Sequence, residues 1–294
     1  MSFVEVTRGQ SPLVLGLPHT GTDVPGDIAE GFNETGRELA DTDWHIHELY
    51  AGLVGDVTTV RTTIHRYVID VNRDPEGASL YPGQNTTSLC PVTDFDGQPI
   101  WREGAEPDAA EIARRRAAYH APYHAALSAE LERVRGIHGF AVLYDCHSIR
   151  SEIPFLFEGV LPDFNVGTDE GRTCAASIKD SVYGTCEAAE GYSAILNGRF
   201  KGGWTTRHYG RPDEGLHAIQ MELAQSTYML ESPPWDYAPE RADLLRAHLK
   251  TILDDPIRWR PEGPIPAITC ATFTRRPAPR SARKAGRPRR RCGC

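Results

Sequence analysis

The chain has 294 residues and a formal net charge of −8, and its last twenty residues carry nine Lys and Arg and no acid. The rest therefore carries 23 basic against 40 acidic side chains, which argues against nucleic acid as a partner of the folded part. The N-terminus lacks the pattern of a signal peptide, and no apolar run reaches the ~20 residues that span a bilayer, so we expect a cytoplasmic protein with no membrane partner.

Cysteine spacing and tail composition bound the domain organisation. The seven cysteines are scattered singly apart from a final C-x-C, which disfavours both a cysteine-ligated zinc site and a disulfide scaffold. The Arg-, Pro- and Ala-rich residues 275–294 cannot form a core, and we predict a disordered basic tail there. That tail could attract RNA or a membrane, or have no function. We predict one α/β domain over residues 1–274, although length alone would also allow two.

The N-terminal half alternates strand patterns with helix patterns. Residues 13–17 form a short apolar run that ends at Pro18, which predicts a buried strand followed by a loop. Near-helical spacing of apolar residues predicts a helix over 35–54, and the Val-, Thr-, Ile- and Tyr-rich segment 57–71 predicts strands. Residues 73–106 are rich in Gly, Pro, Asn and Asp, a long excursion that is unusual unless it covers something.

The C-terminal half continues this alternation. A long helix is predicted from Pro107 to Gly136 or Gly139, with a kink or division at Pro122. Periodicity and composition then predict strands and helices in turn, with strands over 140–146, 153–157, 192–196 and 216–223, and helices over 172–183 and 238–253. Strands interleaved with crossover helices predict an α/β fold, in which a mostly parallel or mixed sheet is covered on both faces.

Histidines follow two of the predicted strands, at the edge where open α/β sheets place their sites. His19 directly follows the first strand and could project into such a crevice, although a lone histidine there is more often a capping or packing residue. Asp145 and His147 end a strongly apolar strand, and alternation along the strand puts both on one face. A ligand histidine with a neighbouring carboxylate fits this pair, because an ionisable pair that ends a buried strand is costly without a purpose.

Acidic residues supply a possible metal ligand and a possible base. Asp41 and Asp43 lie early on the predicted helix over 35–54, where acids favour the helix dipole. Asp43 could instead be a metal ligand, since zinc accepts histidine and carboxylate together. Glu222 lies inside the apolar run LHAIQMEL. It is either a buried carboxylate that serves as a general base or a solvent-facing residue of an edge strand.

Several arginines indicate an anionic substrate. Asn72 and Arg73 close the segment HRYVIDVNR, which also contains Arg66, while Arg207 and His208 lie in the glycine-rich loop GRFKGGWTTRHYG. An adjacent amide and guanidinium can clamp a carboxylate, although any one arginine alone would be interpreted as a solvated surface residue. The sequence contains no G-x-S-x-G elbow, Walker loop or G-x-G-x-x-G after a strand, which disfavours serine hydrolases, NTPases and dinucleotide enzymes.

Taken in order, six segments resemble the N-formylglutamate amidohydrolase family over about residues 10–255, namely LPHTG, TDWHIHELY, HRYVIDVNRDP, DCHSI, FKGGWTTRHYG and IQMEL. The resemblance implies a three-layer α/β/α fold like that of zinc carboxypeptidases, and hydrolysis of N-formyl-L-glutamate to formate and L-glutamate in histidine degradation. The alternative is a zinc deacylase or carboxypeptidase-like enzyme that acts on another N-acyl amino acid. A non-catalytic carboxylate-binding protein would be favoured by loss of Glu222 or a histidine ligand, and none is missing.

The resemblance also implies a metal site. It implies His19 and His147 as ligands of a zinc ion, or of another divalent metal, with Asp43 as the acidic ligand. Carboxypeptidases place a glutamate three residues after the first histidine, and this chain has Thr22 there. The acidic ligand therefore stays open among three candidates, Asp43, Asp23 and Asp41.

The remaining roles concern catalysis and the substrate. By the same resemblance Glu222 would be the general base, and His208 or an arginine would help to stabilise the oxyanion. Asn72 and Arg73 would resemble the carboxypeptidase pair that holds a substrate carboxylate. Two further arginines would complete the binding of a small anionic amino-acid substrate, Arg207 at its second carboxylate and Arg66.

Overall fold

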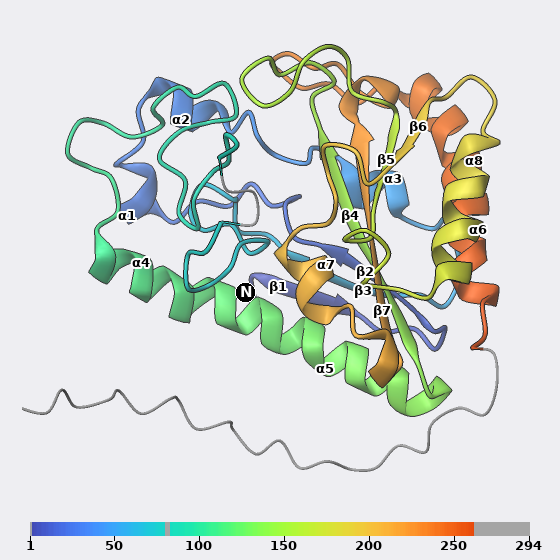
Figure 1. The fold of residues 1–294 in the computed structure, drawn as a ribbon. Helices are drawn as coiled ribbons and strands as arrows, with labels where there is room; N and C mark the ends of the chain where they lie inside the picture. The colour runs from blue at the N-terminus through green and yellow to red at the C-terminus, as the bar shows by residue number, and fades with distance from the viewer. Residues whose placement is uncertain (1, 80–82, 262–294) are drawn as a thin grey trace, which may run out of the picture.

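The structure is a computed structural model that describes residues 2–79 and 83–261. These residues build a seven-stranded mixed sheet in the order β1-β3-β2-β4-β7-β5-β6 (Figure 1). Strands β3, β2, β4 and β7 run in parallel, whereas β1 and β5 run antiparallel to their neighbours β3 and β7. The strands comprise β1 Val4–Thr7, β2 Leu13–Leu17, β3 Thr58–Thr62, β4 Ala141–Ile149, β5 Phe164–Gly167, β6 Ala194–Leu196 and β7 Leu216–Ala224.

Helices cover both faces of this sheet. One face carries α5 and the short α7, and the other face carries α3, α6 and α8 (Figure 1). This arrangement confirms the predicted three-layer α/β/α fold with a mixed sheet. The helices comprise α1 Gly26–Ala29, α2 Glu34–Glu38, α3 Ile46–Tyr50, α4 Ala109–Arg115, α5 Ala121–His138, α6 Ala176–Glu187, α7 Trp204–Tyr209 and α8 Pro239–Arg258.

Alternation along β4 determines which layer each of its side chains meets. Val142 packs in the apolar cluster that α6 and α8 share, whereas Leu143 packs in the cluster formed with α5. Every residue of β4 is buried, as expected for a parallel strand that is covered on both faces. Because successive side chains point to opposite faces, Asp145 and His147 lie on the α5 face.

The predicted helix over 35–54 is wrong. Two short helices, α2 and α3, are separated by a segment in which Leu39 and His45 have a left-handed backbone, with φ of 51° and 58°. Left-handed residues end helical hydrogen bonding, so Asp43 lies in a loop rather than on a helix. The backbone N–H of Asp43 donates to the carbonyl of His19 at 3.0 Å, which brings the two residues together.

Of two further predicted strand regions, 57–71 is confirmed only in its first part and 153–157 is wrong. Within 57–71 only β3 is a strand, and turns follow, since the Asp70 carboxylate accepts the N–H of Asn72 at 2.9 Å in a local turn. Residues 153–157 form turns, and Ile153 packs with Phe95 in a small separate apolar cluster. Apolar content alone does not separate such a packed loop from a buried strand.

Pro122 does not break the long helix at the place predicted. A π-helical turn over Arg116–His120 joins α4 to α5, and Pro122 lies in the first turn of α5. A proline inside an α-helix lacks the N–H donor and clashes with the carbonyl four residues earlier, and the wider π turn accommodates it. The helix ends at Gly139, whose φ of 79° needs glycine.

The predicted excursion after Arg73 covers the carboxyl end of the sheet. Its described residues, 73–79 and 83–106, contain no helix or strand. They contribute five residues to the wall of the cavity described below, namely Arg73, Asn85, Thr86, Thr87 and Phe95. The excursion therefore covers something, as its length predicts.

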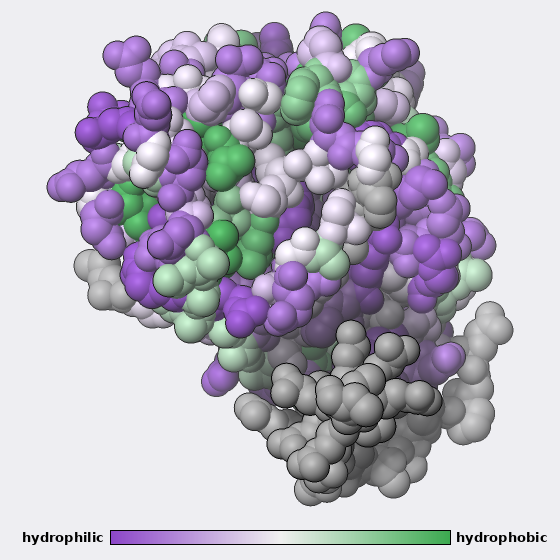
Figure 2. Space-filling view, turned by 60° about the vertical axis from the view of Figure 1, so that its left-hand side comes forward, coloured by the Kyte–Doolittle hydropathy of each residue, from purple (hydrophilic) through white to green (hydrophobic). Residues whose placement is uncertain are grey.

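The surface and the length of the helices are relevant to the expectation of no membrane partner. The face shown in Figure 2 is mainly hydrophilic, with small groups of hydrophobic side chains near its middle. Within the described ranges, every helix is too short or too polar to cross a membrane. The predicted domain boundary at residue 274 and the predicted tail over 275–294 lie outside the described residues.

Two neighbouring leucines of α8 test the packing of the outer layer. Leu245 is fully buried against the sheet, whereas Leu244 is 67% exposed. We expect Leu245→Ala to lower the free energy of unfolding by about 2–5 kcal/mol, because it removes buried methyl groups and leaves a cavity. Leu244→Ala should stay within about 0.5 kcal/mol of the wild type. Urea unfolding followed by circular dichroism measures both, and equal losses would contradict the described orientation of α8.

Candidate active site

A cavity opens at the carboxyl ends of β2, β4 and β7, on the α5 face of the sheet. The empty space in it is about 600 Å³ with the open mouth included. Position and lining agree with the expectation that open α/β sheets bind ligands beyond their strand ends. Six residues singled out in the sequence line it: His19, Arg66, Asn72, Arg73, His147 and Glu222.

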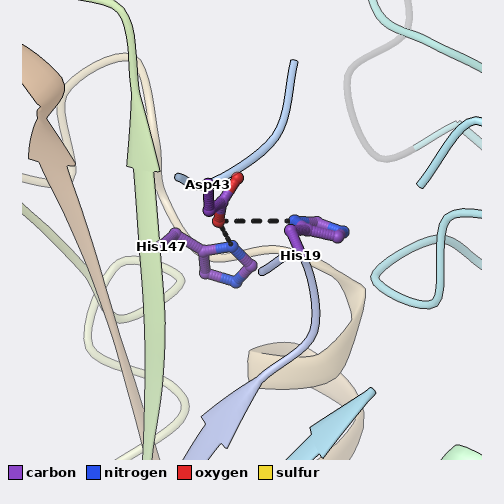
Figure 3. A group of neighbouring side chains, drawn as sticks. All are labelled: His19, Asp43 and His147. Carbon is purple, nitrogen blue, oxygen red and sulfur yellow. Dashed lines mark hydrogen bonds and ion pairs between the residues drawn. The ribbon is translucent and has the colours of Figure 1, made fainter. Parts of the chain in front are cut away.

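His19, Asp43 and His147 form a buried cluster in this cavity (Figure 3). Oδ2 of Asp43 lies 3.7 Å from Nδ1 of His19 and 3.1 Å from Nδ1 of His147. All three side chains are at most 3% exposed. Their ligand atoms lie within 4.8 Å of one another, so the cluster could hold a metal ion.

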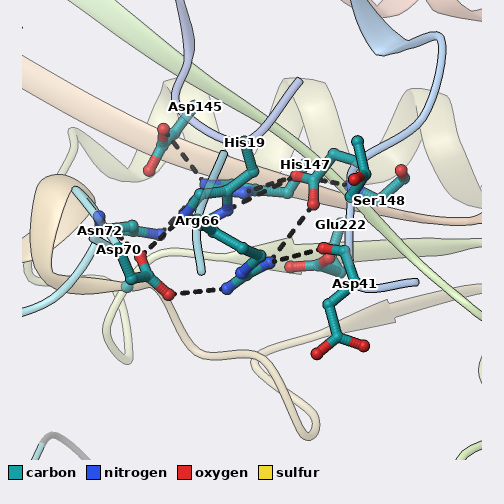
Figure 4. Close-up of polar contacts among 12 residues, drawn as sticks. His19, Asp41, Arg66, Asp70, Asn72, Asp145, His147, Ser148 and Glu222 are labelled. Atoms are coloured by element: carbon teal, nitrogen blue, oxygen red, sulfur yellow. Dashed lines mark hydrogen bonds and ion pairs between the residues drawn. The ribbon is translucent and has the colours of Figure 1, made fainter. Parts of the chain in front are cut away.

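The second nitrogen of each histidine faces a buried aspartate (Figure 4). Nε2 of His19 lies 2.7 Å from Asp70, and Nε2 of His147 lies 3.3 Å from Asp145. Since a carboxylate only accepts hydrogen bonds, Asp70 favours a proton on Nε2 of His19 and leaves the lone pair on Nδ1 of that ring. This carboxylate–histidine arrangement typically orients the histidines of metal sites. Among the described residues, Nδ1 of His19 has no hydrogen-bond partner.

Asp43 is the acidic residue that the fold brings to the histidines. The backbone N–H of Ser148 donates to its Oδ2 at 3.2 Å, and Arg66 donates to its Oδ1 at 3.4 Å. Of the two competitors, Asp41 is turned away and accepts the N–H of Phe95 at 2.9 Å, and Asp23 is exposed. The geometry therefore favours Asp43 for the acidic position that the sequence leaves open.

Glu222 lies beside the cluster on the next strand. In the pairing of β4 with β7, His147 and Glu222 are partners in register, so their side chains share one face of the sheet. β7 lies between β4 and β5, which excludes the edge-strand alternative. Burial raises the pKa of Glu222 to about 7. Such a buried carboxyl is suited to accept and release a proton near neutral pH.

Two histidines of the long helix hold the segment that carries Asn72 and Arg73. Nε2 of His124 lies 2.7 Å from the carbonyl of Val71, and Nε2 of His120 lies 3.1 Å from the carbonyl of Arg73. Burial lowers the pKa of His124 to about 3, so this ring is neutral and donates its proton to the carbonyl. The side chain of Asn72 is thereby held with its amide nitrogen 3.1 Å from Nε2 of His147.

Two predicted site residues lie outside this cavity. Arg207 donates to the carbonyl of Gly202 at 2.9 Å, and its Nη1 lies 3.3 Å from Asp169. His208 is exposed and stacks on Trp204, with ring centroids 4.2 Å apart. Neither residue lines the cavity. Both are on α7, whereas Gly203, the residue just before this helix, lines the cavity.

Sequence reasoning assigned no role to two residues that the structure places here. Asp70 belongs to the segment that carries Asn72, and its position two residues before that asparagine was its only signal. Arg199 lines the cavity from the glycine-rich loop before α7, where only Arg207 and His208 were singled out. The sequence of this segment does not show which of its arginines, Arg199 or Arg207, points into the cavity.

Comparison with known proteins finds relatives over most of this chain. Two relatives called N-formylglutamate deformylase, from Pseudomonas aeruginosa and Pseudomonas putida, are 45% and 44% identical to this chain. The matches cover 86% and 87% of this chain and 95% and 96% of the relatives. The crystal structure of N-formylglutamate amidohydrolase from Ralstonia eutropha JMP134 has a TM-score of 0.71 at 27% identity, and the match covers 87% of this chain and 97% of that one.

A sequence model of the N-formylglutamate amidohydrolase family matches residues 11–229. The match spans the segments that contribute the histidine cluster, Glu222 and the arginines of the cavity. The chain therefore belongs to the N-formylglutamate amidohydrolase family.

Proposed function

We propose that this protein is a zinc-dependent amidohydrolase that cleaves N-formyl-L-glutamate to formate and L-glutamate. The observation that carries the proposal is the buried cluster of His19, Asp43 and His147 beside Glu222, in a cavity that arginines also line. The names of the two Pseudomonas relatives support the choice of substrate. The protein has a net negative charge, yet three arginines line this cavity. Their gathering there supports an anionic substrate.

The cluster fits a divalent metal. Two imidazole nitrogens and one carboxylate oxygen are the donor types of catalytic zinc sites, which keep a further position open. The buried Nδ1 of His19, with no hydrogen-bond partner in the described part of the chain, would be satisfied by a cation. When bound, the metal would act as a Lewis acid that polarises the formyl oxygen and lowers the pKa of water. Other divalent ions accept the same donors.

Glu222 would move the proton. Its carboxylate accepts a proton from the water that attacks the formyl carbon, and then gives that proton to the departing nitrogen as the C–N bond breaks. Formate leaves from the carbon and L-glutamate leaves with the nitrogen. The side-chain amide of Gln220 donates to Oε2 of Glu222 at 2.9 Å, which holds the carboxylate in place between these two transfers.

Arg73 would hold the α-carboxylate of the substrate. It lines the cavity, and it is oriented by donating to the backbone carbonyl and hydroxyl oxygens of Thr87 at 3.1 and 3.0 Å. Arg66 also lines the cavity, where it contributes positive charge near the cluster. A substrate fixed in this way presents its formyl carbon with little further loss of rotational freedom.

Removal of one histidine tests the metal site. We expect purified wild-type protein to hold about one divalent ion per chain, and His19→Ala or His147→Ala to hold close to none, because each variant removes one of three protein ligands. Elemental analysis after dialysis against buffer measures this. His248→Ala on α8, on the opposite face of the sheet, is the matched control and should keep its metal. Full metal content in both cavity variants would contradict the assignment.

Substitution of the proposed base separates chemistry from metal binding. We expect Glu222→Gln to keep its metal but to lower kcat by about 10²- to 10⁴-fold, since an amide cannot accept the proton. Formate release from N-formyl-L-glutamate measures kcat. Glu130→Gln, which changes a buried glutamate paired with Arg8 and Arg133 on α5, should keep kcat. Wild-type turnover by Glu222→Gln would remove Glu222 from the mechanism.

Arg73 should matter for every N-formyl amino acid, because all of them carry an α-carboxylate. We expect Arg73→Gln to raise KM by about 10- to 100-fold for both N-formyl-L-glutamate and N-formyl-L-alanine, from loss of a charge-assisted hydrogen bond. Steady-state kinetics with the two substrates measures the change. A loss confined to one of them would show that Arg73 binds something other than the shared carboxylate.

A further inference from the structure

The arginines that line the cavity contact different groups of the protein. Among its described residues, the cavity wall carries one glutamate, Glu222, and three arginines, Arg66, Arg73 and Arg199. Arg66 lies 2.8 Å from Asp70 and 3.4 Å from Asp43, and Arg73 lies 3.5 Å from Asp70. Both of these arginines therefore face Asp70, and Arg66 also faces Asp43 of the histidine cluster.

Arg199 is held by two backbone carbonyls on a different wall. Its Nε donates to the carbonyl of Leu156, and its Nη2 donates to the carbonyl of Asn85, both at 3.1 Å. The guanidinium also lies over the ring of Phe200, 5.5 Å from its centroid. These contacts join three separate segments, so the planar group is already oriented before a ligand arrives.

The spacing of Arg73 and Arg199 suits a short diacid. Arg73 bonds Thr87, and Arg199 bonds the carbonyl of Asn85, so the same loop holds both arginines at positions two residues apart. Two residues of extended chain span at most ~7 Å. The two carboxyl carbons of glutamate lie ~5 Å apart when its carbon chain is extended. Two guanidiniums anchored in this way can each meet one end of such a molecule.

Arg207 does not offer the same arrangement. Its Nη1 lies 3.3 Å from Asp169, and Arg207 does not line the described wall of the cavity, whereas Arg199 does. We infer that Arg199 binds the side-chain carboxylate of the substrate and makes the enzyme selective for N-acylated acidic amino acids over neutral ones of the same size. This inference rests on the proposed function and adds the residue that determines its specificity.

The test compares a charged substrate with its neutral isostere. The ratio of kcat/KM for N-formyl-L-glutamate to that for N-formyl-L-glutamine should be high in the metal-loaded wild type and about 10- to 100-fold lower in Arg199→Gln. Arg199→Lys, which keeps the charge, should recover part of the ratio. Arg172→Gln, an exposed arginine bonded to Asp169, is the matched control and should leave the ratio unchanged.

Binding of the product supplies a readout that does not depend on turnover. By titration calorimetry, Arg199→Gln should weaken binding of L-glutamate by about the same factor and leave that of L-glutamine unchanged. If the kcat/KM ratio were unchanged in Arg199→Gln, or fell only in Arg207→Gln, this inference would be wrong while the proposed function would stand. Absence of formate release from N-formyl-L-glutamate by the wild type would overturn the proposed function, and this inference with it.

Discussion

The site depends on two buried aspartates that each meet the Nε2 atom of a histidine. Asp70 favours a proton on Nε2 of His19 and so directs the lone pair of Nδ1 toward Asp43, and Asp145 lies beside Nε2 of His147. A buried carboxylate is costly unless it is paired; Asp70 meets His19, Arg66 and Arg73, and Asp145 accepts the hydroxyl of Thr206. Burial would raise the pKa of Asp70, but Arg73, His19 and Arg66 hold it well below the usual range, so it stays ionised.

Asp70 also links the histidine cluster to the arginines of the cavity wall. It accepts the N–H of Asn72 and faces both Arg66 and Arg73. The residues proposed for metal binding and for substrate binding are thus parts of one charge network rather than two sites placed side by side. Such networks are energetically sensitive in both directions, since removal of one member leaves the others buried and unpaired.

The histidines and Glu222 could be predicted because each follows from a single strand. An apolar run that ends in a polar residue identifies a strand end, and strand ends meet at one edge of a parallel sheet. Asp43 could not be placed in this way, because its position depends on two left-handed residues, Leu39 and His45, in a stretch with helical spacing. The choice between Arg199 and Arg207 likewise depends on which of the two side chains points into the cavity, and residue type carries no information about that.

The π turn before Pro122 links the active site to the long helix that covers the sheet. Its additional residue per turn determines where His120 stands relative to the apolar stripe of α5, and hence where the Arg73 carbonyl is held. Loss of one residue from Arg116–His120 would leave the packing of α5 on the sheet in place while rotating everything before it by about 100°. The position of Arg73 at the cavity therefore depends partly on the number of residues in a helical turn, and not only on the type of each residue.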